Sequence, residues 1–336
     1  MSNIVVVDIG GTYTRAAIMT TQGHIDHQEK YLNYAYDNVI TILNQYINSH
    51  QLVIDSQTRC CIAMAGPVAN GMGTLTNIAW TLDVDTLKKQ LPFSQIALAN
   101  DFHALGYCIP RLTENDTITL QEVTYPNHPC KTLVGAGTGL GVAHVHLNNN
   151  TVHVHPSEGG HVDFAPTNRQ QIRLLEFLLK KYQHVSYEHI LSGHGIEHLF
   201  EFLCLENKTT FNNDYHASPD ISGKKIIQLA MNENNILAME TISLFCDIYA
   251  AFLGNIALQD LPYGGIYITG GIAKHITPKI THPDFLKSYH TKGRLSSILK
   301  KIPIYYITHP HAGLLGAGNY MQQIAAPLQP KILHYQ

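Results

Sequence analysis

The chain has 336 residues, enough for one large domain or two of ordinary size. Hydrophobic residues make up 45% of it and charged residues 14%, which excludes a disordered chain. The formal net charge of -3, without a stretch rich in Lys and Arg, argues against a general nucleic-acid binder, because such a protein needs a basic face.

The first hundred residues alternate between predicted strands and helices. Strands are expected where β-branched and apolar residues run together and end at glycine or polar residues. Asp37 or Asn38 is expected to cap a helix whose apolar side chains, from Val39 to Ile47, recur at helical spacing. The predicted strands are 3–8, 15–19, 24–31, 60–64 and 95–99, and a second helix is predicted over 83–90.

The pattern restarts after residue 130. A strand over 131–134 enters the glycine-rich loop Gly135–Gly141, and strands over 142–146 and 151–155 are predicted to pair as a hairpin. The remaining predicted helices are about 170–181, about 224–258 and 313–323, and the remaining strands are 265–269 and 303–308.

A unit of strand, glycine turn and strand therefore occurs twice, at Asp8–Thr14 and at Gly135–Val142. This repetition predicts two related α/β domains rather than one. We place the boundary between them near Pro110.

Neither a secretory signal nor a membrane span is predicted. The apolar run 4–7 is too short for a signal-peptide core and ends at Asp8. The longest apolar stretch, Leu237 to Leu258, contains Glu240 and Asp247, so we interpret it as a buried helix. The six cysteines form no CxxC pair and lie mostly in apolar segments, as reduced core cysteines do. These features favour a cytoplasmic protein.

The first motif with chemical potential is Asp8-Ile9-Gly10-Gly11-Thr12. Two glycines after a strand let backbone N–H groups approach a phosphate closely, because no Cβ stands in the way. Asp8 at the mouth of this turn is suited to hold a hydrated Mg²⁺. An ordinary hairpin turn explains the motif equally well.

The second motif is the loop Gly135–Gly141, with Thr138 at its centre. It is not a dinucleotide-binding fingerprint, because the third glycine position holds Leu140 or Val142. The segment Ser222–Lys225 is likewise not a P-loop, since it lacks the upstream glycine and the residue required after the lysine. Paired with the first motif, the loop predicts the second half of a phosphate clamp.

The third motif, Asn100-Asp101, follows a predicted strand. A carboxylate there can accept a proton from a substrate hydroxyl. An aspartate directly after a strand is more often the N-cap of a helix, however, so that alternative stays open.

The fourth motif, Glu158–Phe164, places Glu158 and His161 on either side of two glycines. A sharp turn there would aim both side chains at one point, and together they fit the vicinal hydroxyls of a sugar. A zinc site is the rival interpretation. A di-iron helix is disfavoured because two glycines make a helix improbable.

Four further histidines alternate along the predicted hairpin, at positions 144, 146, 153 and 155. They would share one face and could bind a metal. We favour the simpler interpretation that they are half-exposed strand residues in a histidine-rich chain.

The four motifs, in this order and spacing, resemble those of a bacterial-type glucokinase of the hexokinase/actin-like superfamily, and specifically of the group A glucokinases of proteobacteria and related organisms. The resemblance runs from end to end. It also includes Leu75-Thr76-Asn77 with Trp80, His184–Glu188, Leu191–Gly193, Gly270–Ile272 and Gly313–Gly316.

The resemblance implies a two-domain α/β fold of the actin-like/ribonuclease H-like ATPase type, with a cleft between a small and a large domain. The small domain would be residues 1–110, completed by the C-terminal helix at about 313–325, and the large domain would be 111–312. The chain lacks the cysteine-rich zinc signature of the other glucokinase branch, so no structural zinc is predicted. The tail 325–336 extends past the expected end.

The resemblance also assigns residue roles. Asp101 is implied as the catalytic base, and the implied sugar ligands are Asn77, Asn100, Asp101, Glu158, His161 and Glu188. The residues implied to bind ATP are Val7, Asp8, Ile9, Gly10, Gly11, Thr12, Thr138, Gly139, Gly270 and Gly271.

The implied activity is phosphorylation of glucose to glucose 6-phosphate with ATP and Mg²⁺, in the cytoplasm and without a nucleic-acid or membrane partner. A homodimer is plausible by the same resemblance. A kinase for another hexose or an N-acetylhexosamine remains an alternative, because the sequence does not size the pocket around the sugar 2-position. A non-catalytic sugar sensor is a weaker alternative.

Overall fold

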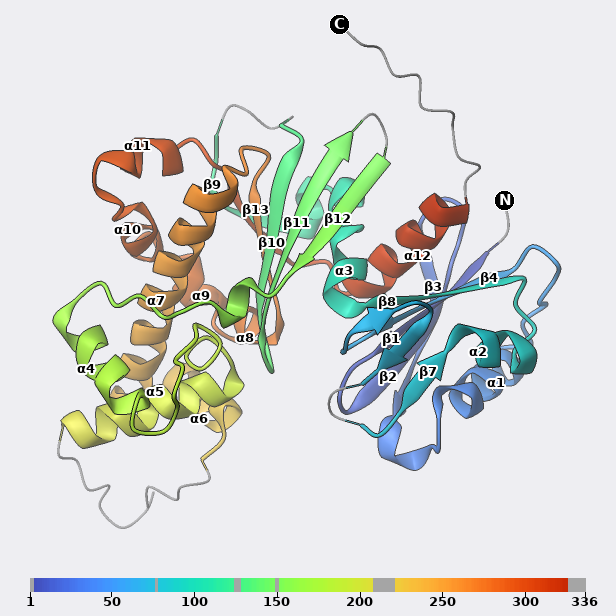
Figure 1. Ribbon diagram of the computed structural model, residues 1–336, viewed down its shortest axis with the longest axis horizontal. Helices are drawn as coiled ribbons and strands as arrows, with labels where there is room; N and C mark the ends of the chain where they lie inside the picture. Colours follow the sequence, from blue (N-terminus) through green and yellow to red (C-terminus); the bar gives the residue numbers. More distant parts are fainter. Residues whose placement is uncertain (1–2, 76–77, 124–127, 149–150, 208–220, 326–336) are drawn as a thin grey trace, which may run out of the picture. The chain divides into compact units, whose positions relative to one another are not determined.

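The computed structural model describes residues 3–75, 78–123, 128–148, 151–207 and 221–325. The chain divides into two compact units (Figure 1). Unit 1 comprises residues 1–113, 147–154 and 309–336, and unit 2 comprises residues 114–146 and 155–308. The first division thus falls three residues after Pro110, and the segment 147–154, which we had placed in the large domain, groups with unit 1.

A five-stranded mixed sheet forms the centre of unit 1, in the order β3-β2-β1-β4-β8. β1 pairs antiparallel with β2, whereas β4 runs parallel to β1 and to β8. The strands are β1 (Ile4–Ile9), β2 (Tyr13–Met19), β3 (Ile25–Leu32), β4 (Arg59–Met64) and β8 (Gln95–Asn100). The helices of unit 1 are α1 (Val39–Ser49), α2 (Val84–Gln90), α3 (Asp101–Gly106) and α12 (Ala312–Ala325), with short 3-10 turns η1 (Asn33–Ala35) and η2 (Ile109–Arg111).

A small second sheet in unit 1 was not predicted. It consists of β5 (Val68–Ala69), β6 (Met72–Thr74) and β7 (Thr81–Asp83). Strands of two or three residues are too short to show the alternation on which sequence-based prediction depends.

A six-stranded sheet forms the centre of unit 2, in the order β12-β11-β10-β13-β14-β9. Its strands are β9 (Thr117–Gln121), β10 (Cys130–Ala136), β11 (Leu140–Asn148), β12 (Thr151–Ser157), β13 (Ile266–Thr269) and β14 (Ile304–Ile307). The helices are α4 (Arg169–Leu178), α5 (Gly193–Glu206), α6 (Gly223–Asn232), α7 (Ile236–Asp260), α8 (Gly271–His275), α9 (Thr277–Ile280), α10 (Phe285–His290) and α11 (Ser296–Leu299), with 3-10 turns η3 (Glu114–Asp116), η4 (Gly159–His161) and η5 (Gly293–Leu295).

The two sheets repeat one topology. Counted within each unit, the strands β1, β2, β3, β4 and β8 lie in the order 3-2-1-4-5, and β10 to β14 lie in the same order. In each sheet the first three strands are an antiparallel meander, and the next two run parallel to the first. The predicted repetition of an α/β unit is confirmed.

The apolar helix α7 lies in the core of unit 2. It is the one helix among the described residues that is long and apolar enough to cross a membrane, but 72% of its apolar window is buried inside the protein. It packs against α5, α6 and α10. The interpretation of this stretch as a buried helix is therefore confirmed.

The helix predicted over 224–258 is in fact two helices, α6 and α7. Asn234 adopts a left-handed backbone conformation with φ of 51°, which ends the helical path, and the side chain of Asn235 caps α7 by accepting from the N–H of Ala238 at 3.0 Å. The polar run Asn232-Glu233-Asn234-Asn235 marks this break in the sequence, because asparagine favours caps and turns, so the prediction of a single helix was wrong.

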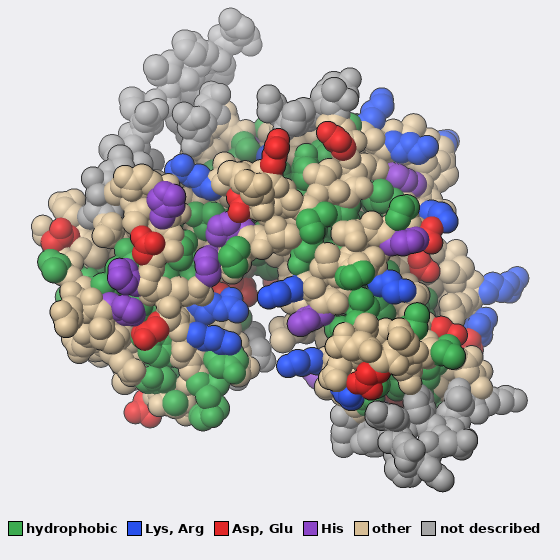
Figure 2. Space-filling view, turned by 180° about the vertical axis from the view of Figure 1, so that it is seen from behind, with side chains coloured by type: hydrophobic (Ala, Val, Ile, Leu, Met, Phe, Trp, Pro, Cys, Tyr) green, Lys and Arg blue, Asp and Glu red, His purple; other side chains and the backbone are tan. Residues whose placement is uncertain are grey.

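All six cysteines are free, and Cys60, Cys61, Cys108 and Cys246 are buried. Most of them are thus core residues, as predicted. On the face of the molecule shown in Figure 2, each unit carries basic, acidic and histidine side chains among uncharged ones. This mixture is consistent with the small net charge.

Candidate active site

The first glycine motif forms the turn between β1 and β2. The N–H of Gly10 donates to the carbonyl oxygen of Tyr13 at 2.9 Å, so the motif is a hairpin turn. Asn33, which is 3% exposed, fixes this turn from beneath. Its Nδ2 donates to the Gly10 carbonyl oxygen at 2.8 Å, its Oδ1 accepts from the Thr14 hydroxyl at 2.8 Å, and its N–H donates to the Thr12 carbonyl oxygen at 3.0 Å.

A phosphate could contact only part of this motif. The side chains of Val7 and Ile9 are fully buried in the core of unit 1, whereas Gly11 and Thr12 are exposed. The buried residues therefore shape the turn, and its exposed backbone is the part open to a ligand. Asn33 went unnoticed in the sequence because a lone asparagine 23 residues from Gly10 carries no local signal.

Asp8 and Asn100-Asp101 lie at the same edge of the sheet of unit 1. Ile9 on β1 is in register with Met64 on β4, and Met64 is in register with Asn100 on β8. Parallel strands thus bring Asp8 and Asp101 to their common carboxyl edge, roughly 10 Å apart across two strand spacings. This edge is where open α/β sheets bind their ligands.

Asp8 is a partly buried carboxylate with a cation beside it. Its side chain is 24% exposed, and its Oδ2 lies 3.6 Å from the guanidinium of Arg15, the residue opposite it on β2. Burial raises the pKa of Asp8, and Arg15 opposes this effect. Gly313, in the first turn of α12, lies beside the same oxygen: a Cβ there would be in ordinary contact with it at 3.5 Å. One carboxylate at such a place fits a hydrated Mg²⁺, which usually keeps several waters.

The N-cap of α3 is Asn100 rather than Asp101. The Oδ1 of Asn100 accepts from the N–H groups of Phe102 and His103 at 3.0 and 3.1 Å, and its Nδ2 donates to the Gly66 carbonyl oxygen at 3.2 Å. The alternative that Asp101 is merely a cap is therefore wrong. The side-chain oxygen of Asn100 and one hydrogen of its amide are thus used in contacts within the protein, which leaves one amide hydrogen for a ligand.

Asp101 is the first residue of α3, and its carboxylate is partly exposed. Burial, and then the negative charge of Asp8, raise the pKa of Asp101 to about 6, although Oδ1 accepts from the N–H of Phe102 at 2.8 Å. A carboxylate of this pKa is ionised at neutral pH and is a stronger base than an ordinary aspartate.

In unit 2, the turn between β10 and β11 holds Glu188. The Glu188 Oε2 accepts from the N–H of Leu140 at 2.7 Å. A Cβ at Gly139 would lie 2.5 Å from that same oxygen, so only glycine allows the carboxylate to settle there. Gly139, implied as a phosphate contact, thus lies directly beneath a residue implied as a sugar ligand.

The turn η4 brings Glu158 and His161 to the same place. The His161 Nε2 lies 3.5 Å from Glu188 Oε1 and 3.9 Å from Glu158 Oε2. All three side chains have exposed surface, and Glu158 is 93% exposed. At Gly160 a Cβ would lie 2.0 Å from the Leu140 carbonyl oxygen, so this glycine lets the turn pack on the hairpin. The structure therefore gathers these three predicted residues into one acidic, hydrogen-bonding group.

No zinc site is found at this group. Among the described residues, no set of three or more His, Cys, Asp and Glu side chains is placed to hold a metal ion. His144 instead pairs with Asp260, with 2.8 Å between Nδ1 and Oδ2. The zinc interpretation of Glu158 and His161 is therefore not supported by the described part of the chain.

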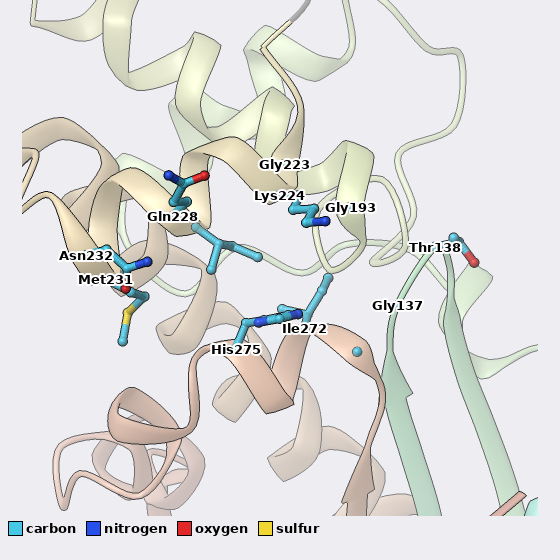
Figure 3. A pocket seen from close by; sticks show the side chains of 12 residues that line it. Gly137, Thr138, Gly193, Gly223, Lys224, Gln228, Met231, Asn232, Ile272 and His275 are labelled. Carbon is cyan, nitrogen blue, oxygen red and sulfur yellow. The ribbon is translucent and has the colours of Figure 1, made fainter. Parts of the chain in front are cut away.

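A cavity of about 530 Å³ in unit 2 begins at the tip of the same hairpin (Figure 3). Gly137 and Thr138 line its entrance, and α6 and α8 face each other across it. Its lining residues are Gly137, Thr138, Gly193, Gly223, Lys224, Ile227, Gln228, Met231, Asn232, Gly271, Ile272 and His275.

Two of the implied nucleotide residues of unit 2, Thr138 and Gly271, line this cavity. Gly270 is next to it and has a φ of 102°, and a Cβ there would lie 2.2 Å from the Ala136 carbonyl oxygen. Sequence reasoning missed the polar face of α6, where Lys224, Gln228 and Asn232 recur every four residues. That spacing places them on one side of a helix and was the available signal.

Asn77 lies outside the described residues, as does the tail 326–336. The structure therefore assigns neither of them a place.

Comparison with known proteins agrees with this geometry. The family model described as glucokinase matches residues 5–324. A glucokinase of Trichormus variabilis is 35% identical over 336 aligned residues, which cover 94% of this chain and 98% of that protein. The chain belongs to the glucokinase family.

Solved structures of glucokinases share the fold. A glucokinase from an Antarctic psychrotroph has a TM-score of 0.83 at 27% identity, covering 96% of this chain and 99% of that one. A ROK-family glucokinase from Streptomyces griseus, solved with glucose and AMPPNP, has a TM-score of 0.65 at 17% identity, covering 96% of this chain and all of the other. The second likeness concerns the fold alone, and it confirms the two-domain actin-like ATPase architecture expected from the sequence.

Proposed function

We propose that this protein transfers the γ-phosphoryl group of ATP to the 6-hydroxyl of glucose, with Asp101 as the general base. One observation in unit 2 supports the proposal: a single hairpin turn contacts both the cavity and the predicted sugar ligand Glu188. Its residues Gly137 and Thr138 line the large cavity, and two residues later Gly139 and Leu140 hold Glu188. A nucleotide in the cavity and a sugar on Glu158, His161 and Glu188 would then meet at this turn.

The reaction needs positioning and charge stabilisation more than covalent help from the protein. Asp101 would take the proton of the glucose 6-hydroxyl while that oxygen forms its bond to the γ-phosphorus. The bond from this phosphorus to the bridging oxygen would break and leave ADP. Exposed backbone at Gly11–Thr12 would donate to phosphate oxygens.

Magnesium fits this scheme through Asp8. Bound with ATP, the ion would offset negative charge on the phosphates. Asp8 would hold it through water, and Arg15 offsets part of the rise in the pKa of Asp8 that burial causes. We place the reaction in the cytoplasm, where ATP is abundant and where free cysteines such as the six in this chain persist.

The function is tested by a coupled assay of ADP release with Mg·ATP. Glucose is compared with mannose, fructose, N-acetylglucosamine and N-acetylmannosamine at equal concentrations. A strong preference for glucose is expected. A preference for an acetylated sugar would keep the base and overturn the substrate, and no turnover with any of them would favour a sensor.

The activity is expected to depend on pH through Asp101. The base works only when ionised, so kcat/KM for glucose should fall as the pH drops through about 6 and should level off above it. If Asp101 had the pKa of an ordinary aspartate, kcat/KM would fall only near pH 4. The measurement is kcat/KM from pH 5 to 8, with coupling enzymes in excess throughout. A flat profile between pH 5 and 7 would contradict the role of Asp101.

Lys224 is expected to contribute to ATP binding, because it is the one lysine or arginine among the described residues that line the cavity. Lys224→Ala should raise KM for ATP about tenfold, as removal of a hydrogen bond to a charged group does, and leave KM for glucose unchanged. Lys225→Ala is the matched control, since Lys225 lies in the first turn of the same helix but pairs with Glu233 at 3.0 Å. Equal effects of the two substitutions would remove Lys224 from the site.

A further inference from the structure

A chain of polar contacts inside unit 2 runs from Lys292 to the residue before Glu188. The Nζ of Lys292 donates to Asn255 Oδ1 at 2.5 Å, and Asn255 Nδ2 donates to the hydroxyl of Tyr187 at 2.7 Å. Asn255 lies on α7, and Lys292 follows α10. None of the three belongs to the groups described above as candidate ligands of glucose or ATP.

The donors and acceptors in these two hydrogen bonds are fixed by the chemistry of the side chains. A lysine ammonium has only donors, so the Asn255 oxygen must face Lys292 and the Asn255 amide hydrogens must face Tyr187. The Tyr187 hydroxyl is thereby made an acceptor. Without Lys292 the Asn255 amide could turn around and lose this orientation.

The fold makes room for Lys292. A Cβ at Gly254 would lie 2.6 Å from Lys292 Cε and 2.8 Å from the Tyr289 carbonyl oxygen, so a glycine at this point of α7 lets the lysine stem cross the helix. Glycine in the middle of a helix is unfavourable by about 1 kcal/mol relative to alanine. The close approach of the Tyr289 backbone, with Lys292 beside it, accounts for the glycine here.

Tyr187 links these hydrogen bonds to the predicted sugar ligands. Its ring is 2% exposed and packs between Phe164 and Phe252, with ring centroids 5.6 and 4.6 Å away. Its N–H donates to the Val162 carbonyl oxygen at 3.1 Å, and the N–H of Glu188 donates to the Gly160 carbonyl oxygen at 2.9 Å. The backbone that carries Glu188 is therefore tied to the turn that carries His161.

We propose that Lys292, Asn255 and Tyr187 are positioning residues of the glucose site, which hold Glu188 and the Glu158–His161 turn at the spacing that the sugar requires. The proposal rests on the proposed function, because it assumes that these side chains bind glucose. It predicts an effect on the sugar and none on the nucleotide, because the cavity for ATP is lined by other residues.

The test measures glucose affinity by calorimetry without ATP, and KM for glucose, KM for ATP and kcat by the coupled assay. Asn255→Ala is expected to weaken glucose binding about tenfold, and Tyr187→Phe about threefold to tenfold. KM for ATP and kcat should stay within twofold of the wild type. The losses should not add in the double variant, because both substitutions break the contact between Asn255 and Tyr187; any further loss beyond Asn255→Ala is that of the contact between the Tyr187 hydroxyl and the Ala165 backbone.

Substitutions of Lys292 test whether this lysine fixes the orientation of the Asn255 amide. Lys292→Met should weaken glucose binding as Asn255→Ala does, and Lys292→Arg, which keeps a donor, should restore part of the loss. Lys300→Met is the control for an exposed lysine of the same unit. Tyr289→Phe is the control for a buried tyrosine hydroxyl that takes no part in these contacts. The Tyr289 hydroxyl instead donates to the Leu299 carbonyl oxygen at 3.4 Å.

The outcomes separate the two proposals. Wild-type protein that binds and phosphorylates no sugar would overturn the proposed function and, with it, this inference. Wild-type protein that uses glucose, with variants that bind glucose normally, would overturn the inference alone. The same holds if KM for ATP rises as much as KM for glucose, or if Tyr289→Phe weakens glucose binding equally, since either result indicates a general loss of packing.

Discussion

Replacing Asp101 by asparagine is expected to lower kcat about a thousandfold, while glucose still binds within a few-fold of the wild-type affinity. The substitution keeps the size of the side chain and one oxygen, so the acceptor for the Phe102 N–H remains. It removes the base, and general acid–base catalysis is typically worth about 10²–10⁴ in rate. The measurement is kcat from the coupled assay together with the dissociation constant for glucose from calorimetry.

The matched control is Asp85→Asn. Asp85 lies in the first turn of α2 in the same unit, as Asp101 lies in the first turn of α3, but it is exposed and makes no side-chain contact with the candidate site. This control should keep full activity. If Asp101→Asn retains a tenth of the wild-type kcat, Asp101 is not the base, and the raised pKa of Asp101 reflects only its burial beside Asp8.

Replacing Glu188 by glutamine is expected to raise KM for glucose about a hundredfold. The Glu188 carboxylate accepts from the Leu140 N–H through one oxygen and faces His161 with the other. A glutamine can accept with only one of these atoms, so its NH₂ group must meet either a backbone donor or the imidazole. Hydrogen bonds to charged groups are worth about 1.5–3 kcal/mol each, and the sugar loses at least one.

Glu201→Gln serves as the comparison for this second substitution. Glu201 is a carboxylate of α5 that pairs with Lys181 at the surface of unit 2, far along the helix from its first turn. Its substitution should leave both Michaelis constants unchanged. An unaltered KM for glucose in Glu188→Gln would show that the sugar binds elsewhere. Because Asp101→Asn acts on kcat and Glu188→Gln on KM, the two substitutions test separate assignments.

Local chemistry was enough to predict the strands of the two main sheets except β9, and the helices α1, α2, α4 and α12, whereas α3, α5 and α8 to α11 were not predicted. Asn38, one of the two predicted caps, does cap α1 by accepting from the Thr41 N–H at 3.0 Å. The apolar face predicted from Val39 to Ile47 is buried except at Ile47, which is half-buried. Helix caps and apolar faces depend on residues within a few positions of one another, so they are legible in the sequence. The glycine turns after β1 and β10 were legible for the same reason.

The sequence by itself thus determined the two α/β units, their glycine turns and the residue types that the candidate site requires. Only the tertiary structure decided which residues meet: that Asn33 supports the first turn, that the Asn100 amide reaches Gly66, and that Gly139 lies beneath Glu188. It also decided that Lys292 reaches Asn255 across Gly254. These contacts join positions tens of residues apart, and they follow from strand register and close backbone approach, which no local pattern encodes.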